Sequence, residues 1–459
     1  MENFSLKWLK RKVVHFIGIG GISMSALALM LKANGVFVQG SDETENDEVK
    51  KLKKKGVNVF VGHKKSNLKN VDAVVYTSAI CDDNEELVEA KKRKLVIIKR
   101  SELLGMVAEN YKIVISVAGS HGKTTAAAMI AEMMIDAGLK PTVHIGGVVN
   151  SLKSNHLIGS KKFFVTESCE YKDNYLFLSP DISVILNIDG DHLDYFGSVD
   201  GVKKSFLKFA SLTKQGGVNV ACADNENSKE ILKLENTVSF GLDESADVYA
   251  KNIKEYKACH YSFDVFFSGC RLGNIRLDII GRHNVYNALA TIVVGIALGV
   301  EFCEIKKSIE KFSGVKRRCQ KISCKGGVLV YHDYAHHPKQ IESMLKVANT
   351  MAGRVNGKVI AVFEPHTYSR TKFLINEFSR SFVSANHVIF APVYSARELP
   401  VMGYDSLKLA AETKKFNKNV EYLETYKEIF VRVKELARPN DVVMILGAGT
   451  IDKLADMFE

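Results

Sequence analysis

One short segment has the residue types and spacing of a phosphate-binding loop. It reads Gly119-Ser120-His121-Gly122-Lys123-Thr124-Thr125, directly after an apolar run and before a helical pattern. Glycines let backbone N–H groups turn toward a phosphate, and a helix start adds partial positive charge. Lys123 supplies a point charge for outer phosphates, and the Thr124 hydroxyl can ligate Mg²⁺. Val117 stands where the full Walker pattern requires a glycine, so a plain turn is the competing interpretation. We expect an ATP site.

Two further side chains follow apolar runs that predict buried strands. Glu167 comes directly after Phe163–Thr166, and His192 follows Ile182–Asn187 through an acidic turn at residues 189–191. Because ligands collect at the carboxyl ends of parallel strands, we expect both side chains near the phosphate loop. A carboxylate there suits Mg²⁺, which prefers oxygen ligands and substrate phosphates. An isolated histidine is usually structural, but the neighbouring acids favour a metal role for His192.

The N-terminal region carries a second glycine-rich turn, residues 18–21, after the apolar run Val13–Ile17. With Asp42 after the next strand, it begins a dinucleotide-binding fingerprint, but Ser23 stands at the third glycine position. The same loop and helix start can instead hold the diphosphate of a UDP-sugar. We favour the diphosphate, because a nicotinamide has no evident task in an ATP enzyme. An NAD-dependent oxidoreductase remains the alternative from another class.

Three blocks of strands and helices position these motifs, which predicts an α/β fold. The first, residues 1–105, alternates short apolar strands with helices and predicts a parallel doubly wound sheet. The second, residues 106–312, adds helices at Thr124–Ala137 and His283–Leu298, and alternating residues 246–280 that predict antiparallel strands. The third, residues 313–459, returns to the α/β rhythm.

Composition narrows the class of protein. The 459 residues include 46% hydrophobic and 25% charged residues, a globular balance that suggests about two to four domains. The net charge is +11, and many lysines stand in short runs without interleaved aromatic residues. We therefore expect these lysines to lie on solvated helix faces and expect no nucleic-acid partner. No signal peptide, membrane-inserting segment or C-x-x-C pair is present. We expect a cytoplasmic protein with reduced thiols; the sequence indicates no oligomeric state.

The ordered motifs together resemble the Mur ligase family, and within it the members that add L-alanine to a UDP-sugar acid. Besides the phosphate loop, the matching segments are Val14–Gly21 with Met24-Ser25, Gly40-Ser41-Asp42, Thr77–Ile80, Gly146-Gly147, Asn187–His192, Gly281–Asn287, Gly314–Arg318, Asp333–Pro338, Pro365–Thr371 and Gly447–Gly449. Each segment alone is weak evidence, whereas their order along nearly the whole chain is specific.

The resemblance implies three domains and a reaction. Residues 1–105 would form a Rossmann-like UDP-sugar domain, 106–312 a P-loop ATPase-like domain, and 313–459 a Rossmann-like amino-acid domain. The implied reaction is ATP-dependent ligation of L-alanine to the lactyl carboxylate of UDP-N-acetylmuramate, through an acyl phosphate, in peptidoglycan precursor synthesis. ATP is the co-substrate and Mg²⁺ the metal. Domain closure would bring the third block onto ATP.

The resemblance also implies roles for individual residues. Catalytic roles fall to Lys123, Glu167, His192 and Arg318, and the metal ligands are Thr124, Glu167 and His192. The ATP-binding set is Gly119, Ser120, His121, Gly122, Lys123, Thr124, Thr125, His283, Asn284, Asn287, Arg318 and Asp333. The UDP-sugar-binding set is Gly18, Ile19, Gly20, Gly21, Ser41, Asp42, Ser78, Ala79 and Ile80. Tyr334, His336, His366 and Arg370 would bind the amino acid.

Three positions depart from the common family pattern. Lys172 and His332 each replace an acid, and Thr367 replaces an arginine. Two further alternatives remain open: a ligase that recycles a tripeptide, and a nucleotide-gated binding module without catalysis. Phosphate release that depends on both L-alanine and the UDP-sugar would separate all of these functions.

Overall fold

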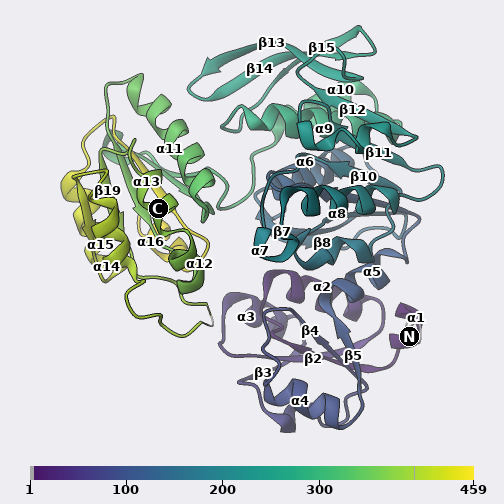
Figure 1. Cartoon of the computed structure of the whole chain (residues 1–459). Coiled ribbons are helices and arrows are strands. Elements are labelled where there is room, and N and C mark those ends of the chain that lie inside the picture. Colours follow the sequence, from purple (N-terminus) through teal and green to yellow (C-terminus); the bar gives the residue numbers. More distant parts are fainter. Residues whose placement is uncertain (1–4, 397) are drawn as a thin grey trace. The chain divides into compact units, whose positions relative to one another are not determined.

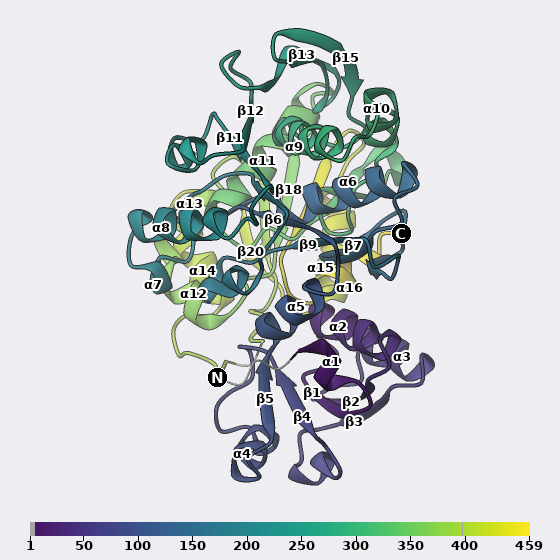
Figure 2. The same cartoon turned by 90° about the vertical axis from the view of Figure 1, so that its right-hand side faces the viewer.

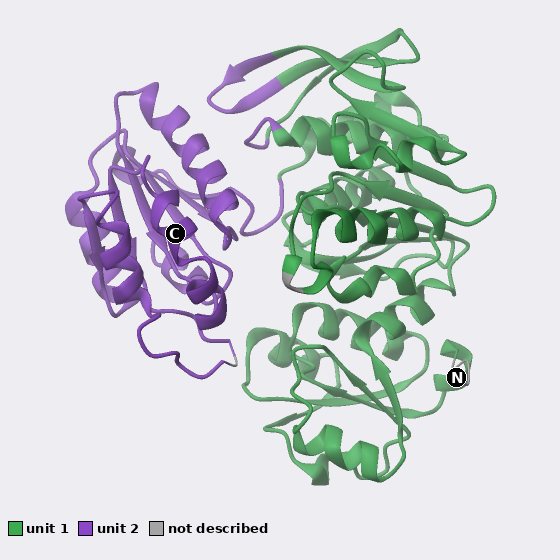
Figure 3. Ribbon diagram, in the orientation of Figure 1, with its two compact units in different colours: residues 1–253, 262–278, 283–313 green, residues 254–261, 279–282, 314–459 purple. Residues whose placement is uncertain are grey.

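The computed structural model describes residues 5–396 and 398–459, which contain β-sheets of five, ten and six strands (Figure 1). The chain folds into two compact units (Figure 3). The first comprises residues 1–253, 262–278 and 283–313, and the second comprises residues 254–261, 279–282 and 314–459. The five-stranded and ten-stranded sheets lie in the first unit, apart from the tip of one hairpin, and the six-stranded sheet lies in the second.

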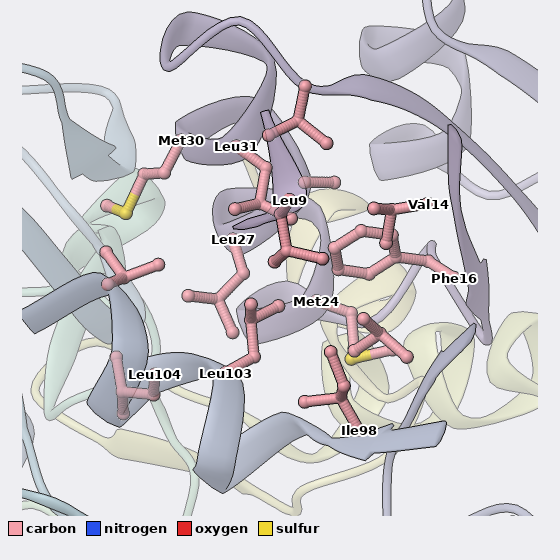
Figure 4. Packing of buried hydrophobic residues seen from close by; sticks show 14 of the residues in the cluster. Leu9, Val14, Phe16, Met24, Leu27, Met30, Leu31, Ile98, Leu103 and Leu104 are labelled. Carbon is pink, nitrogen blue, oxygen red and sulfur yellow. The ribbon is translucent and has the colours of Figure 1, made fainter. Parts of the chain in front are cut away.

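The N-terminal sheet has the strand order β3-β2-β1-β4-β5, and all its neighbouring strands are parallel. This confirms the predicted doubly wound sheet. Its elements are α1 (Leu6–Leu9), β1 (Val13–Ile17), α2 (Ile22–Ala33), β2 (Phe37–Asp42), α3 (Asp47–Lys54), β3 (Asn58–Val61), β4 (Ala73–Tyr76), α4 (Glu85–Lys92), β5 (Val96–Lys99) and α5 (Arg100–Ala108). Apolar side chains from α2, α5 and β1, among them Phe16, Leu27 and Leu103, pack into one core (Figure 4).

The central sheet has the order β15-β14-β13-β12-β11-β10-β6-β9-β7-β8. Its parallel core, β10-β6-β9, carries the phosphate loop at one end. The strands are β6 (Ile113–Ala118), β7 (Thr142–Val149), β8 (Ser154–Leu157), β9 (Phe163–Glu167), β10 (Ile182–Ile185), β11 (Val218–Cys222), β12 (Thr237–Gly241), β13 (Val248–Lys257), β14 (His260–Phe267) and β15 (Cys270–Arg276). The pairing of β14 with β15 is antiparallel, as the alternating pattern predicted.

Helices cover the central sheet and are apolar toward it. They are α6 (Lys123–Asp136), α7 (Leu193–Phe196), α8 (Val199–Ser211), α9 (His283–Ala297) and α10 (Phe302–Lys311). Helices α6 and α9 pack directly against each other (Figure 2). Because α6 begins with the phosphate loop and α9 begins with His283 and Asn284, this packing sets two predicted ATP-binding segments side by side.

The second unit is built on the strand order β16-β17-β21-β18-β19-β20. Its strands are β16 (Gln320–Ser323), β17 (Leu329–Asp333), β18 (Val359–Phe363), β19 (His387–Phe390), β20 (Val420–Tyr422) and β21 (Val442–Leu446). Its helices are α11 (Pro338–Gly353), α12 (Tyr368–Phe373), α13 (Ile375–Ser381), α14 (Ser406–Thr413), α15 (Tyr426–Leu436) and α16 (Asp452–Asp456). No helix in the described part of the chain has the length and apolar character needed to cross a membrane.

Candidate active site

The phosphate loop connects β6 to α6, and its backbone requires glycine. Gly122 has a φ of +85°, a conformation that side chains with a Cβ rarely adopt. A Cβ at this position would also lie 2.9 Å from Asn287 Oδ1, on α9. From the end of β10, Asn187 holds the loop, because its Oδ1 accepts the N–H of His121 at 2.8 Å and its Nδ2 donates to the His121 carbonyl at 3.0 Å. The loop is therefore rigidly held before any nucleotide binds.

Lys123 is the first residue of α6, and its ammonium already has strong partners. Nζ donates to the Gly119 carbonyl at 2.5 Å and lies 2.9–3.0 Å from the two oxygens of Glu170. Burial by itself opposes the charge, but the carboxylate of Glu170 outweighs it and raises the pKa of Lys123. Lys123 therefore carries a full positive charge inside the loop at neutral pH. Thr124 is buried beside it, and Thr125 is half-buried.

The structure gathers three metal-type ligands next to this lysine. Single ligand atoms of Glu170, Asp191 and His192 lie within 4.8 Å of one another. His192 has a φ of +55°, and its ring lies 4.7 Å from that of Tyr171. Of the three predicted metal ligands, His192 belongs to this group, whereas Thr124 and Glu167 are not among its members.

Glu167 instead contacts β7, because the Gly146 N–H donates to its Oε2 at 3.2 Å. A Cβ on Gly146 would lie 2.5 Å from Glu167 Oε1, which explains the glycine there. Sequence reasoning missed Glu170 and Asp191 as site residues. The available signal was their position in loops that follow β9 and β10, at the same sheet edge as the phosphate loop.

Three residues of the predicted ATP-binding set, His283, Asn284 and Asn287, lie in the first turns of α9. Asn284 and Asn287 are both buried, and Asn287 Nδ2 donates to Asn284 Oδ1 at 2.8 Å. His283, at the helix start, is exposed. Asn287 lies against Gly122, so the amide pair adjoins the phosphate loop. The two amides therefore form a polar surface beside the loop.

The predicted UDP-sugar residues meet at one edge of the N-terminal sheet. Strand β1 lies between β2 and β4, with Ile17 level with both Ser41 and Tyr76. Gly18, Ile19, Gly20 and Gly21 follow β1, Ser41 and Asp42 end β2, and Ser78, Ala79 and Ile80 follow β4. The Ser41 carbonyl accepts the N–H groups of Gly18 and Ile19 at 2.8 and 2.9 Å, and Asp42 Oδ2 accepts that of Gly20 at 2.9 Å. Asp42 is thus committed to the loop itself.

A buried polar cluster beneath this edge had no sequence signal. The carboxylate of Glu86 is fully buried and accepts the Ser41 hydroxyl at 2.5 Å and Asn67 Nδ2 at 2.7 Å. His63 Nδ1 and His15 Nε2 lie 3.1 and 3.4 Å from the same carboxylate. Burial opposes the charge, but these partners hold the pKa of Glu86 well below its usual range.

In the second unit, Asp333 ends β17 and is fixed by backbone donors. Cys319 N–H and Ala335 N–H donate to its two oxygens at 2.7 and 2.8 Å. Burial nevertheless raises the pKa of Asp333. The exposed Arg318 stacks on Tyr334 at 5.1 Å. Arg317, which was not predicted to take part, donates to the carbonyls of the glycine turn at residues 447–449 at 3.0 and 2.9 Å.

The four predicted amino-acid-binding residues lie together in this unit. Arg370 Nη1 is 3.2 Å from His366 Nδ1, and the His336 ring lies 6.0 Å from the His366 ring and 5.4 Å from the Tyr334 ring. Burial and the charge of Arg370 lower the pKa of His336 to about 3 and that of His366 to about 4. Both imidazoles are therefore neutral at physiological pH, and Arg370 supplies the positive charge of this cluster.

The three departures from the family pattern have distinct surroundings. Lys172 has a φ of +54° and lies over the Tyr171 ring, while the next residue, Asp173, accepts Tyr195 OH at 2.8 Å. His332 is buried, and burial lowers its pKa to about 3, so it is neutral. Thr367 has a φ of +66°.

Models of known protein families match the chain in three successive segments. Residues 13–112 match the Mur ligase family catalytic domain, 117–295 the Mur ligase middle domain, and 317–449 the Mur ligase glutamate ligase domain. UDP-N-acetylmuramate–L-alanine ligase of Caldicellulosiruptor bescii is 42% identical over 445 residues, covering 96% of this chain and 97% of its own. The corresponding ligase of Clostridium tetani is 40% identical over 456 residues, covering 99% and 98%.

Solved structures agree with these matches. The crystal structure of UDP-N-acetylmuramate-alanine ligase from Thermotoga maritima has a TM-score of 0.83 and 28% identity, covering 97% of this chain and 98% of its own. A murein peptide ligase from Psychrobacter arcticus shares the fold, with a TM-score of 0.74 at 22% identity over 97% of this chain and 98% of its own. Because the relatives are similar over almost their full length and the family segments follow in order, this chain belongs to the Mur ligase family.

Proposed function

We propose that the chain ligates L-alanine to the lactyl carboxylate of UDP-N-acetylmuramate at the expense of ATP, in peptidoglycan precursor synthesis. The observation that carries this proposal is the full-length similarity to ligases of that name, at 40–42% identity. The site geometry supports it, because a lysine-bearing phosphate loop adjoins the group Glu170, Asp191 and His192. We assign UDP-sugar binding to residues 1–105, ATP binding to 106–312 and alanine binding to 313–459. We infer that it acts in the cytoplasm, where ATP and nucleotide sugars are available.

In the first step, a carboxylate oxygen of the sugar acid attacks the γ-phosphorus of ATP. The bond from that phosphorus to the β,γ-bridging oxygen breaks, ADP leaves, and an acyl phosphate forms. Lys123 is charged and fixed in the loop, so it neutralises the terminal phosphates without reorganising. ATP phosphates would replace Glu170 as partners of the Lys123 ammonium. The family resemblance assigns further contacts to Arg318 on the γ-phosphate and Asp333 on the ribose.

Magnesium fits the donors beside the loop. Glu170 and Asp191 offer carboxylate oxygens, His192 offers a ring nitrogen, and Thr124 offers a hydroxyl at the start of α6. Carboxylate oxygens together with substrate phosphates are the usual ligands of Mg²⁺ in phosphoryl transfer, so the oxygens of Glu170 and Asp191 suit this ion. The bound ion would neutralise charge that develops on the phosphates.

In the second step, the amine of L-alanine attacks the acyl carbon. Phosphate leaves with the electron pair of the C–O bond, the amine loses a proton, and an amide remains. Arg370 suits the alanine carboxylate, because a guanidinium binds a carboxylate in a bidentate way. His336 and His366 are neutral, so they do not repel the alanine amine by charge.

Phosphate release with each substrate omitted in turn tests this function. We expect release only when ATP, Mg²⁺, UDP-N-acetylmuramate and L-alanine are all present. Release that requires the tripeptide L-alanyl-γ-D-glutamyl-meso-diaminopimelate in place of alanine would assign a recycling ligase instead. Absence of any ATP turnover with either acceptor would contradict the proposed function.

A further inference from the structure

A polar junction connects the N-terminal and central sheets within the first unit. Ser23, in the first turn of α2, lies 2.9 Å from His144 Nε2 on β7 and accepts Arg100 Nη1 at 3.3 Å. Asn155 Nδ2 on β8 donates to the carbonyl of Ile22 at 2.8 Å. The first turn of α2 is thus joined to β7 and β8, the two outermost strands at one side of the central sheet.

Arg100 occupies a distinctive place in this junction. It is the first residue of α5, directly after β5, so it lies at the same sheet edge as the UDP-sugar loops. Its guanidinium has five N–H donors, and the acceptor recorded for it among the described residues is Ser23 Oγ. Burial lowers the pKa of Arg100, while Glu167 and Cys169, on and just after β9, oppose that shift. Arg100 therefore lies at the UDP-sugar edge and joins the start of α5 to the first turn of α2.

Among the junction residues Ser23, Arg100, His144 and Asn155, Arg100 is the one that carries a positive charge. His144 is buried, and burial together with the nearby Arg100 lowers its pKa to about 3. Its Nδ1 lies 3.2 Å from the Thr166 hydroxyl, one residue before Glu167. His144 is therefore neutral and connects α2 to the central sheet. An anion that enters the junction would interact with the guanidinium of Arg100.

We propose that Arg100 binds the lactyl carboxylate of the UDP-sugar and thereby selects the acid over neutral UDP-sugars. This inference rests on the proposed function. The substrate must extend from the glycine loop of α2 toward the phosphate loop, and Arg100 lies where those two edges meet. A carboxylate that approaches a triphosphate is repelled by it, and a fixed guanidinium offsets this repulsion while it orients the attacking oxygen.

The diphosphate of the same substrate is the other anion within reach. The N–H groups of the loop at residues 18–21 and the start of α2 already form an anion site for it. Arg100 follows a different strand, β5, and donates to Ser23, whose hydroxyl also lies 2.9 Å from His144 of the central sheet. We therefore assign it to the carboxylate, and the experiment distinguishes the two groups.

The test measures affinity by calorimetry for UDP, UDP-N-acetylglucosamine and UDP-N-acetylmuramate, with Arg100→Met, Arg100→Lys and wild type. Only the third ligand carries the lactyl carboxylate. For Arg100→Met we expect the affinity for UDP-N-acetylmuramate to fall by about 10- to 100-fold, as for loss of a charged hydrogen bond, with the other two ligands unaffected. The affinity of Arg100→Lys for UDP-N-acetylmuramate should lie between those of wild type and Arg100→Met. Lysine keeps the positive charge but lacks the planar guanidinium that binds a carboxylate through two hydrogen bonds. Arg93→Met is the matched control, because Arg93 is an exposed arginine directly after α4, and this variant should match wild type.

Retained UDP binding also reports that each variant is folded. Unchanged affinity of Arg100→Met for UDP-N-acetylmuramate would overturn the inference. An equal loss for all three ligands would overturn the carboxylate assignment in favour of the diphosphate. If Arg100→Met does not fold, the same comparison is made with Arg100→Lys. The proposed function is tested separately by wild-type phosphate release, so the two can fail independently.

Discussion

At the scale of single residues, the phosphate loop shows an ion pair where a nucleotide is expected to bind. Lys123 lies 2.9–3.0 Å from Glu170, a carboxylate that is almost fully buried. The pair keeps the lysine charged and aimed into the loop, which lowers the reorganisation needed when phosphates arrive. The same arrangement makes the lysine and the carboxylate interdependent for stability.

Replacement of Lys123 by alanine should abolish turnover. The change removes the fixed positive charge at the terminal phosphates, so we expect kcat to fall by about 100- to 1,000-fold or more. Steady-state phosphate release measures this. Lys204→Ala, an exposed lysine on α8, is the control and should keep wild-type rates. Normal turnover in Lys123→Ala would show that the ATP site lies elsewhere.

The double variant Lys123→Ala/Glu170→Gln should be more stable than Lys123→Ala alone. The single change leaves the Glu170 carboxylate buried without its ammonium, at a cost of about 1–3 kcal/mol, and the second change removes that charge. Urea unfolding of the wild type, both single variants and the double variant measures the coupling. Additive effects within error would show that the pair contributes nothing to stability.

Residue-level chemistry was partly visible in the sequence. Lys123 and His192 were recognisable because each follows a strand in a loop of functional composition. Glu170 and Asp191 were not, because the contact between them depends on how two separate loops fold back. Lys172 and Asp173 both adopt positive φ just after Glu170, a local backbone path that residue spacing does not predict.

At the scale of elements, the buried carboxylate of Glu86 connects several parts of the N-terminal sheet and its helices. Glu86, in the first turn of α4, ties that helix to the end of β2 through Ser41 and to the loop residue His63. The Ser41 carbonyl in turn accepts hydrogen bonds from the backbone N–H groups of Gly18 and Ile19. Glu86 thus links a helix, a strand end and the UDP-sugar loop, so its protonation should affect all three.

Acid should remove the contribution of Glu86 to stability. Its pKa in the folded protein is below its usual value of 4.5, so its contribution is complete above that value and is lost as pH falls toward the folded pKa. We expect Glu86→Gln to cost about 1–3 kcal/mol at neutral pH, with the difference from wild type shrinking toward about pH 3. Urea unfolding across this range measures it.

Glu132 on α6 provides a control of opposite sign. It is also a buried carboxylate, but burial raises its pKa, so its charged form opposes folding at neutral pH. Glu132→Gln should therefore not lose stability as pH rises from acid to neutral. If both variants showed the same pH profile, the distinct role assigned to Glu86 would be wrong.

Strand prediction worked where apolar runs were continuous. The bounds of β1, β4, β18, β19 and β21 agree with the apolar runs of the sequence. Strand β7 was missed because Gly146 and Gly147 interrupt its apolar pattern, and the close approach of Glu167 explains the glycine at position 146. Strand β3 was missed because Asn58 interrupts its short apolar run, which follows a lysine-rich helix.

At the scale of the whole molecule, the two compact units carry different binding chemistry. The predicted UDP-sugar residues and the phosphate loop belong to the first unit, and the cluster around Arg370 belongs to the second. Substitutions in the cluster around Arg370 should therefore change the affinity for L-alanine and leave the affinity for the UDP-sugar unaffected.

Arg370→Lys tests this division. Loss of the bidentate fork should raise the KM for L-alanine by about 10- to 100-fold, while the affinity for UDP-N-acetylmuramate stays within about twofold. Phosphate-release kinetics and calorimetry give the two values. Arg380→Lys, an exposed arginine on α13, is the matched control. Equal losses for both substrates would contradict separate binding by the two units.

The surroundings of Lys123 also bear on how the protein reacts with electrophiles. Cys169 precedes Glu170, and burial together with that carboxylate raises the pKa of its thiol, so little thiolate forms. Cys81, Cys270, Cys303 and Cys324 are exposed. A maleimide dye or a mild oxidant would therefore modify these exposed thiols first and leave the Cys169 thiol unmodified. Fluorescent labels could be attached without chemical damage to the phosphate loop.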